Sequence, residues 1–275
     1  MQDYQAKVKP VWCPGCGDFS VLTVLYRALA DRNLDPENVV IVSGIGCSGR
    51  LPIFVNSYGF HGVHGRVLPT AMGVKIANPE LTVIAVGGDG DGLAIGGGHF
   101  PHAARRNIDI TYIMLDNNIY GLTKGQASPT TAPHFESRSS PYGTKEDTLN
   151  PIGLSLAYNV PFVARGYSAK PNQMLDLFLE GIEHKGFSFI QVMSPCVVFN
   201  DTYKFYNDRV VPIPENHDPS DKLRALELWQ DPGKIYLGKF YRDDRPDFHA
   251  RQAAFMSRFQ KRPAGDVEEL LAEHA

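Results

Sequence analysis

The chain has 275 residues, 43% of them hydrophobic, which is enough apolar surface for a globular protein with a sizeable core. The formal net charge is −3, from 27 basic and 30 acidic residues, so no general basic surface favours nucleic acid. The first residues lack the apolar segment of a signal peptide, and no apolar run approaches the ~18 residues of a membrane span. We therefore expect a cytoplasmic protein that binds neither nucleic acid nor membrane.

The first predicted element is a helix at residues 18–32, where apolar side chains recur at helical spacing and Asp18 is expected to cap the amino end. Strands are expected at residues 38–44, 81–88 and 108–117, because each is a short run rich in β-branched residues. These runs are continuous rather than alternating. That pattern is typical of strands buried on both faces, and it predicts a parallel sheet.

Further helices are expected between and after these strands, at residues 69–77, 93–106, 151–158 and 172–185. Another apolar strand begins at Phe187, and the alternation predicts a doubly wound, mainly parallel α/β domain. After Cys196 the chain mixes prolines with aromatic and charged residues, with a short helix expected near residues 222–229 and another at the C-terminus. We therefore expect a domain at residues 1–198 and a C-terminal docking extension at residues 199–275.

A Gly-x-Gly-x-x-Gly pattern, "GIGCSG", follows the first predicted strand, where a dinucleotide-binding fingerprint would lie. A Rossmann site also requires an acidic residue about 20 positions later to hold the ribose. No Asp or Glu occurs between Glu37 and Glu80, which argues against NAD. The same segment contains basic side chains, so it favours an anionic ligand such as a diphosphate, although it could also be a solvated basic loop.

One carboxylate and two amide side chains lie at the ends of neighbouring predicted strands. Asp89 lies between glycines in "VGGDGDGLAIGGG", and Asn117 and Asn118 follow the next strand. Because the carboxyl ends of parallel strands meet at one edge of a sheet, these groups should converge there. A carboxylate, an amide and a loop carbonyl can coordinate Mg²⁺, which bridges two phosphates. Together the segments resemble the thiamine diphosphate-binding motif; either asparagine could be the ligand.

The four cysteines suggest a metal or iron–sulfur site. "WCPGCG" resembles a thioredoxin motif, but only ten residues precede Val11, which leaves no room for the βαβ unit that this fold requires. Structural zinc and a cluster fit the spacing equally well. Because Cys47 lies within the anion-binding loop, a [4Fe–4S] cluster there could accept electrons from chemistry on the cofactor, a role that zinc cannot fill.

The segments "WCPGCGD", "GIGCSGR", "HGVHGRVLPTAMGVKIANP", "GGDGDGLAIGGGHF" and "DNNIYGLTKGQASPT" together closely resemble the β subunit of 2-oxoacid:ferredoxin oxidoreductases. The similarity covers about residues 10–200, and "GIGCS" resembles the 2-oxoglutarate branch more than the pyruvate branch. It implies oxidative decarboxylation of a 2-oxoacid with coenzyme A, or the reverse reaction, with electrons passing through the cluster to ferredoxin. Alternatives are a pyruvate-specific or broad-specificity enzyme and, from another class, a non-enzymatic electron-transfer subunit.

The resemblance also implies the site residues. The expected [4Fe–4S] ligands are Cys13, Cys16, Cys47 and Cys196, and the expected Mg²⁺ ligands are Asp89, Asn117 and the carbonyl of Ile119. The residues expected to contact thiamin diphosphate are Ile45, Gly46, Cys47, Ser48, His64, Gly88, Asp89, Gly90, Asp91, Asn117, Ile119, Tyr120, Gly121, Leu122 and Thr123.

Three further side chains are candidates for contact with the reacting groups. His64 is expected to donate a hydrogen bond to the diphosphate or to the substrate carbonyl, although His61 could take this role. Arg50 and Lys124 are the cations best placed by sequence to meet a distal substrate carboxylate, or else the cofactor phosphates or a partner. Thiamin enzymes of this kind take an essential glutamate from a second domain, so an α subunit is expected, in an α2β2 assembly or larger.

Overall fold

The computed structural model of the chain describes residues 1–259 and 271–273. Its strands are β1 (Val39–Ser43), β2 (Tyr58–His61), β3 (Thr82–Gly88), β4 (Ile110–Asp116), β5 (Phe162–Tyr167), β6 (Phe187–Met193), β7 (Val210–Pro212) and β8 (Ile235–Arg242). They form one sheet in the order β2-β1-β3-β4-β6-β5-β8-β7. The pairs from β2 to β5 are parallel, whereas β8 runs antiparallel to β5 and parallel to β7.

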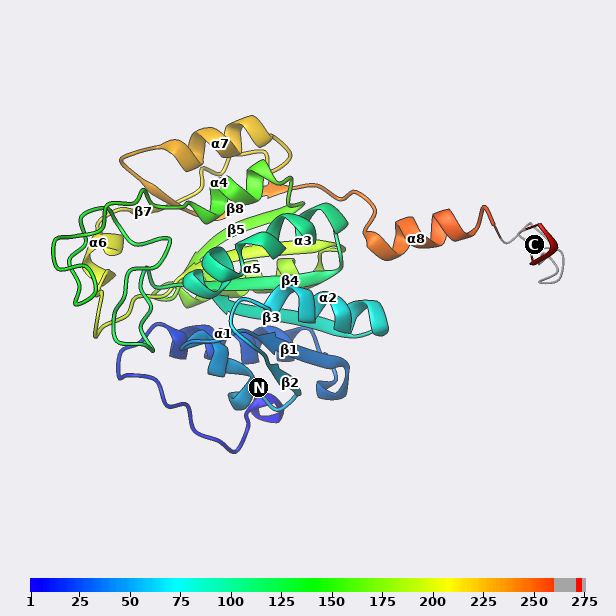
Figure 1. The fold of residues 1–275 in the computed structure, drawn as a ribbon, viewed down its shortest axis with the longest axis horizontal. Helices are drawn as coiled ribbons and strands as arrows, with labels where there is room; N and C mark the ends of the chain where they lie inside the picture. The colour runs from blue at the N-terminus through cyan, green and yellow to red at the C-terminus, as the bar shows by residue number, and fades with distance from the viewer. Residues whose placement is uncertain (260–270, 274–275) are drawn as a thin grey trace.

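Helices cover both faces of this sheet (Figure 1). The α-helices in the described part of the chain are α1 (Asp18–Asp31), α2 (Val67–Ala77), α3 (Phe100–Arg106), α4 (Pro151–Ala157), α5 (Pro171–Glu183), α6 (Tyr203–Asn207), α7 (Lys222–Gln230) and α8 (Phe248–Met256). Helices α1 and α5 pack on one face, and α2, α3, α4 and α7 pack on the other. The expected doubly wound α/β architecture is therefore confirmed.

The continuous apolar runs of the strands have a direct structural reason. Along β1, Val39 and Ile41 enter the core beneath α1 and α5, whereas Val40 and Val42 enter the core beneath α2 and α3. Alternate side chains of a strand point to opposite faces, so a strand covered on both sides must be apolar at every position. The pattern used to predict a parallel sheet follows from this arrangement.

Some expectations for the elements were wrong. Asp18 does not cap α1: Gly17 is the cap residue, and the Asp18 carboxylate accepts a hydrogen bond from Ser194 Oγ at 2.7 Å. Residues 93–106 do not form a single helix, because the glycine-rich segment forms the short helices η4 (Asp91–Ile95) and η5 (Gly97–His99) before α3. Consecutive glycines weaken a regular helix, which explains the break.

Strands β2, β5, β7 and β8 were not expected from their sequences. Strand β5 reads "FVARGY", in which Arg165 and Gly166 interrupt the apolar run, yet every residue of the strand is buried. Strand β8 belongs to the segment expected to form a docking extension, and it adds to the sheet beside β5 with a register shift between Val163 and Ala164. Whether these segments form strands thus depends on pairing with segments that are distant in the sequence.

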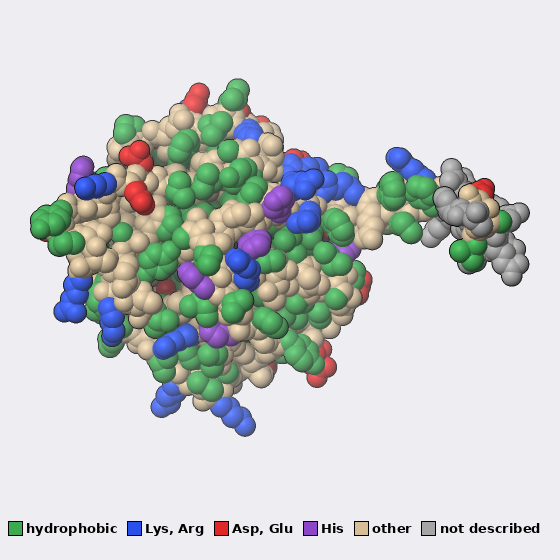
Figure 2. Space-filling model, viewed as in Figure 1, with side chains coloured by type: hydrophobic (Ala, Val, Ile, Leu, Met, Phe, Trp, Pro, Cys, Tyr) green, Lys and Arg blue, Asp and Glu red, His purple; other side chains and the backbone are tan. Residues whose placement is uncertain are grey.

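The segment after β6 lies against the main sheet and then leaves it. Helix α7 packs beside α4, whereas α8 projects away from the body in Figure 1. The expected second C-terminal helix corresponds in part to α8, while residues 260–270 and 274–275 lie outside the described residues. On the face seen in Figure 2, most histidine side chains lie across the middle of the body, whereas Lys and Arg side chains lie both beside them and along the left and lower edges. None of the described helices is long and apolar enough to cross a bilayer.

Candidate functional site

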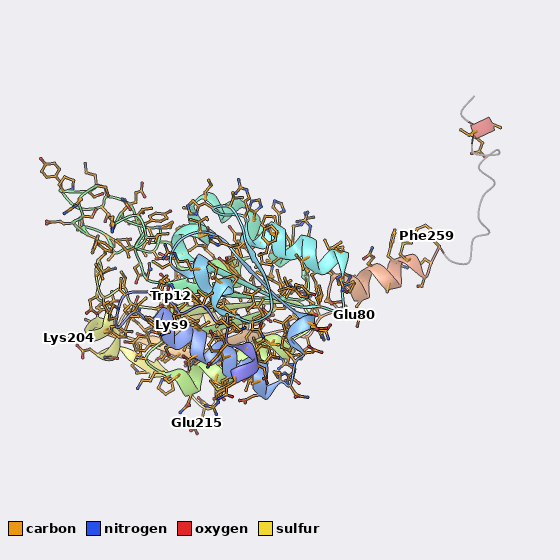
Figure 3. All side chains as sticks on the ribbon, turned by 90° about the horizontal axis from the view of Figure 1, so that it is seen from below. Lys9, Trp12, Glu80, Lys204, Glu215 and Phe259 are labelled. Atoms are coloured by element: carbon orange, nitrogen blue, oxygen red, sulfur yellow. The ribbon has the colours of Figure 1, made fainter. Side chains whose placement is uncertain are left out.

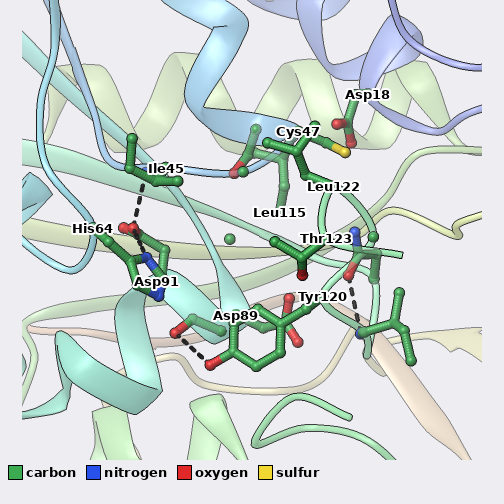
Figure 4. A pocket seen from close by; sticks show the side chains of 17 residues that line it. Asp18, Ile45, Cys47, His64, Asp89, Asp91, Leu115, Tyr120, Leu122 and Thr123 are labelled. Carbon is green, nitrogen blue, oxygen red and sulfur yellow. Dashed lines mark hydrogen bonds and ion pairs between the residues drawn. The ribbon is translucent and has the colours of Figure 1, made fainter. Parts of the chain in front are cut away.

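The loops that follow β1, β3 and β4 meet at the carboxyl edge of the sheet, because these three strands are neighbours. Between the loops lies a cavity of about 190 Å³ (Figure 4). Its lining consists of Asp18, Ile45, Gly46, Cys47, Ser48, His64, Gly88, Asp89, Gly90, Asp91, Leu115, Asn117, Ile119, Tyr120, Gly121, Leu122 and Thr123. All residues expected to contact thiamin diphosphate are therefore brought together around one cavity.

Asp91 joins the loops around this cavity. Its Oδ1 accepts hydrogen bonds from the backbone nitrogens of Ile45 at 2.9 Å and Gly65 at 2.8 Å. The same oxygen lies 2.9 Å from Nδ1 of His64, as Figure 4 shows. Asp91 is buried and His64 is half-buried, so this carboxylate holds the imidazole at the cavity wall.

Glycines permit the close packing of these loops. A Cβ at Gly44 would lie 1.9 Å from Oδ2 of Asp91, and a Cβ at Gly90 would lie 2.2 Å from the ring of Tyr120. Gly46 has a φ of +108°, a conformation that favours glycine. The glycine-rich sequences therefore serve both backbone conformation and close contact between loops.

Asp89 lies at the base of the cavity. Its Oδ2 accepts hydrogen bonds from Ser128 Oγ at 2.5 Å and Thr130 Oγ1 at 2.6 Å. Burial, followed by the nearby Asp116 carboxylate, raises the pKa of Asp89 to about 7. A divalent cation would favour the ionised carboxylate, so this environment suits a metal ligand.

The two adjacent asparagines face different surroundings. Asn117 lines the cavity with Asp89, and its Oδ1 accepts a hydrogen bond from the backbone nitrogen of Ile119 at 3.0 Å. Asn118 has a φ of 56°, and its amide donates to Asp116 and to the carbonyl of Thr130, while its Oδ1 accepts from Tyr206. The oxygens of Asp89, Asn117 and Ile119 that surround the cavity are of the type that Mg²⁺ prefers.

The four cysteines come from distant segments but lie near one another. A Cβ built on Gly121 would lie 3.5 Å from Sγ of Cys196 and 3.8 Å from Sγ of Cys47. Cys13 and Cys196 both influence the pKa of the Cys47 thiol. Trp12 Nε1 donates to the carbonyl of Cys47 at 2.8 Å, which ties the Cys-x-x-Cys segment to this loop.

Burial is the main cause that raises the pKa of the Cys47 thiol to about 11, and burial also raises the pKa of Cys16. Among the described residues, no three His, Cys, Asp or Glu side chains are arranged as ligands of a single metal ion. In a [4Fe–4S] cluster each cysteine binds a different iron, so its thiols need more space between them than ligands of one ion. The four neighbouring thiols, of which Cys47 lines the cavity, are thus compatible with a group of this type.

Three acidic or hydroxyl side chains near the cofactor cavity were not predicted. Asp18 lines the cavity, and burial raises the pKa of its carboxyl to about 6. Ser128 and Thr130, which hold Asp89, belong to the run "SPTT", whose clustered hydroxyls could have indicated a polar support for the metal site. Leu115, also unpredicted, adds an apolar contact from β4. These residues reach the site through tertiary packing.

The three candidate polar residues occupy different places. His64 lines the cavity opposite Cys47 (Figure 4), whereas His61 is exposed and its Nδ1 lies 3.1 Å from Ser43 Oγ. Arg50 does not line the cavity, but its charge lowers the pKa of the Cys47 thiol in opposition to burial. Lys124 is exposed and lines a neighbouring hollow, in the loop after β4 that extends from the body in Figure 3.

Comparison with known proteins places this geometry in a family. Residues 44–192 match the C-terminal TPP-binding domain of thiamine pyrophosphate enzymes, and residues 196–257 match the C-terminal part of the pyruvate ferredoxin oxidoreductase β subunit. The β subunit of a 2-oxoacid:ferredoxin oxidoreductase from Saccharolobus solfataricus is 40% identical, with 95% of each chain covered. The 2-oxoglutarate synthase subunit KorB of Methanocaldococcus jannaschii is 38% identical over 89% of this chain and 92% of its own.

A solved structure is also closely similar. It is the 2-oxoglutarate:ferredoxin oxidoreductase from Magnetococcus marinus with 2-oxoglutarate, coenzyme A and succinyl-CoA bound. The TM-score is 0.94 at 42% identity, covering 100% of this chain and 95% of the other. The fold and the thiamin diphosphate-binding character of the site are therefore shared with known enzymes.

Proposed function

The chain belongs to the β subunits of the 2-oxoacid:ferredoxin oxidoreductases, and we propose that its enzyme oxidatively decarboxylates 2-oxoglutarate, forming succinyl-CoA from coenzyme A with release of CO₂ and transfer of two electrons to ferredoxin, or catalyses the reverse reaction. The observation that carries the proposal is a cavity lined by Asp89, Asn117 and Cys47, with the other three cysteines close to Cys47. A cofactor that decarboxylates 2-oxoacids and an electron acceptor would then be neighbours, as one-electron transfer requires.

Asp89, Asn117 and the carbonyl of Ile119 would hold Mg²⁺ with the diphosphate of the cofactor. Support comes from the presence of all three residues in the cavity lining and from the hydrogen bonds that engage Asn118 with other partners. When bound, thiamin diphosphate supplies the carbon nucleophile that attacks the 2-oxoacid. The protein's own groups orient it: Asp91 fixes the surrounding loops and His64, and the glycines admit the phosphates close to the backbone.

Cys13, Cys16, Cys47 and Cys196 would bind a [4Fe–4S] cluster that passes electrons to ferredoxin. The proximity of these thiols to one another, and of Cys47 to the cofactor cavity, supports this assignment over structural zinc. Iron and sulfide analysis of an anaerobic preparation, with visible absorbance, tests it. Stoichiometric zinc in a colourless protein would instead support a structural metal.

An α subunit would complete the active site, in an α2β2 assembly. The carboxylates lining the cavity are Asp18, Asp89 and Asp91, and no glutamate from the described residues lines it. Activation of the cofactor requires a carboxylate on its aminopyrimidine ring, which the α subunit would supply. We further propose a cytoplasmic location, since a reducing compartment keeps cysteines available for a cluster. Residues 1–198 would carry both cofactors and residues 199–275 would serve docking.

The substrate assignment is tested on the reconstituted αβ complex under anaerobic conditions. Ferredoxin reduction is measured with 2-oxoglutarate, pyruvate and 2-oxobutyrate, and we expect the highest kcat/KM for 2-oxoglutarate. A preference for pyruvate or equal use of all three would contradict the assignment while leaving the enzyme class intact. Asp89→Ala is the control for the class: it should abolish every 2-oxoacid activity, whereas an electron-transfer subunit would keep its function.

A further inference from the structure

A second cavity, of about 370 Å³, lies near the carboxyl edge of β4, β5 and β6 and shares no lining residue with the cofactor cavity. Its walls come from these strands, the loop after β4 and the segment between α6 and β8. The residues used below are Asp116, Arg165, Arg209, Trp229, Asp231 and Lys234. Asn117 lines the first cavity and Asn118 the second, so adjacent residues separate the two spaces.

Arg165 lies in the wall of this second cavity, and some hydrogen-bond donors of its guanidinium have no partner. The residue is 7% exposed, and its Nε donates to Gln191 Oε1 at 2.8 Å. Within the described part of the chain, its two terminal nitrogens form no hydrogen bond or ion pair, and the guanidinium carbon lies 5.3 Å from the centre of the Phe240 ring. A buried guanidinium with open donors is costly unless an acceptor meets them.

Other lining residues add an apolar surface and positive charge. The indole of Trp229 forms part of the wall, but its buried Nε1 is closed off from the cavity and has no partner among the described residues. Arg209, whose guanidinium lies 4.2 Å from the Phe205 ring centre, and Lys234 add positive charge to the lining. The cavity therefore combines one buried cation with more exposed ones.

The acidic side chains of the lining already have donors. Asp116 accepts from Thr130 at 2.8 Å, from Gln191 at 2.7 Å and from Asn118. Asp231 accepts from the backbone of Gly233 at 2.9 Å and from Tyr236 at 3.1 Å. The Asp116 charge attracts the Arg165 guanidinium, but neither carboxylate forms a hydrogen bond or ion pair with it, so its terminal donors are left for an acceptor in the cavity.

We propose that this cavity is a second ligand site, for a small molecule that carries a carboxylate or phosphate group. The terminal nitrogens of Arg165 donate two parallel hydrogen bonds to its oxygens, and Arg209 and Lys234 contribute attraction from the mouth. Planar, two-pronged recognition requires arginine, and lysine cannot replace it. The site is separate from the reaction on 2-oxoacids and does not depend on the assignment of the substrate.

The test uses the αβ complex saturated with Mg²⁺ and thiamin diphosphate, so that the diphosphate position is filled. Thermal unfolding is followed during separate titrations with inorganic phosphate and with acetate, since a ligand that binds the folded state raises Tm saturably. We expect saturation with at least one probe, and the effective probe identifies the oxyanion. Arg165→Lys should weaken the apparent affinity at least tenfold, and Lys185→Gln, an exposed cation remote from the cavity, should not.

The combined change of Arg209→Gln and Lys234→Gln provides a second variant that keeps Arg165; it should also weaken binding, because it removes the two exposed cations of the lining. The proposal is overturned if neither probe gives a saturable shift, or if Arg165→Lys and this double variant both respond like the wild type. A carboxylate of the α subunit seated on Arg165 would produce the first of these negative results.

Discussion

Oδ1 of Asp91 lies 2.9 Å from the backbone nitrogen of Ile45, so the loop that follows β3 is tied directly to the loop that follows β1. The same oxygen also accepts a hydrogen bond from the backbone nitrogen of Gly65 and lies within hydrogen-bond distance of Nδ1 of His64. Asp91→Ala should therefore leave buried donors without a partner and lower the free energy of unfolding by about 1–3 kcal/mol. It should also weaken thiamin diphosphate binding, because the loops around the cofactor would separate.

Asp91→Asn is the matched variant, since it keeps an oxygen acceptor at similar geometry. We expect its free energy of unfolding in urea and its affinity for thiamin diphosphate to lie between those of Asp91→Ala and the wild type. Equal behaviour of Asp91→Ala and the wild type would show that the loops hold together without this carboxylate.

The second prediction concerns pH. Burial, followed by the Asp116 carboxylate, raises the pKa of Asp89 to about 7, and Mg²⁺ binds only the ionised carboxylate. The affinity for Mg²⁺ and thiamin diphosphate should therefore fall as pH decreases below about 7, approaching tenfold per pH unit. Calorimetric titration between about pH 5.5 and 8 measures this, with Asp176→Asn as a surface control. A constant affinity across that range would refute the coupling.

The same raised pKa has the opposite effect on the stability of the chain without metal. Between about pH 4 and 7, the folded state holds a proton on Asp89 that the unfolded state has released. The stability from this group is thus present at low pH and is lost as pH rises through the folded pKa. Asp89→Asn should flatten this part of a plot of unfolding free energy against pH.

The third prediction addresses the cluster. Cys-to-Ser changes at Cys13, Cys16, Cys47 or Cys196 should remove cluster absorbance and ferredoxin reduction while leaving thiamin diphosphate binding measurable. Each serine keeps a similar volume but is a poorer ligand for iron. Iron content, visible spectra and cofactor titration measure these properties separately. A variant that retains full iron and electron transfer would remove that cysteine from the ligand set.

The fourth prediction is that His64→Ala lowers turnover. Asp91 accepts from Nδ1 of His64, so Nε2 can donate to the diphosphate or the substrate carbonyl only when the ring is the doubly protonated imidazolium. Loss of one such donor commonly costs ~100-fold or more in kcat when it acts on developing charge. His61→Ala is the matched control, because His61 is exposed and does not line the cavity. Unchanged turnover and cofactor affinity in His64→Ala would exclude this residue from the site.

The fifth prediction concerns substrate choice. If Arg50 or Lys124 meets the distal carboxylate of 2-oxoglutarate, its change to Ala should lower kcat/KM for 2-oxoglutarate about tenfold or more relative to pyruvate. Both residues lie outside the cofactor cavity lining, so an extended substrate or a partner would have to reach them. Equal losses with the two substrates in both variants would show that neither residue reads the distal carboxylate.

Much of the fold could be predicted because a strand covered on both faces must be apolar at each position. Strands β3 and β4 were found in this way, and their pairing places Gly88 beside Leu115 near the site. Strand β5 was missed because Arg165 and Gly166 break its pattern, and Arg165 is buried only because β6 supplies Gln191. Local sequence carries no information about such a distant partner.

The sequence by itself determined the doubly wound fold class, because strands buried on both faces need continuous apolar runs, and its resemblance to a known family indicated most of the residues that surround the cofactor cavity. Only the tertiary structure decided that Asn117 faces the cavity while Asn118 turns toward Asp116 and Tyr206. It also decided that Asp18 lines the cavity instead of capping α1. Side-chain direction in a loop depends on hydrogen-bond partners from other segments, and folding alone brings those partners together.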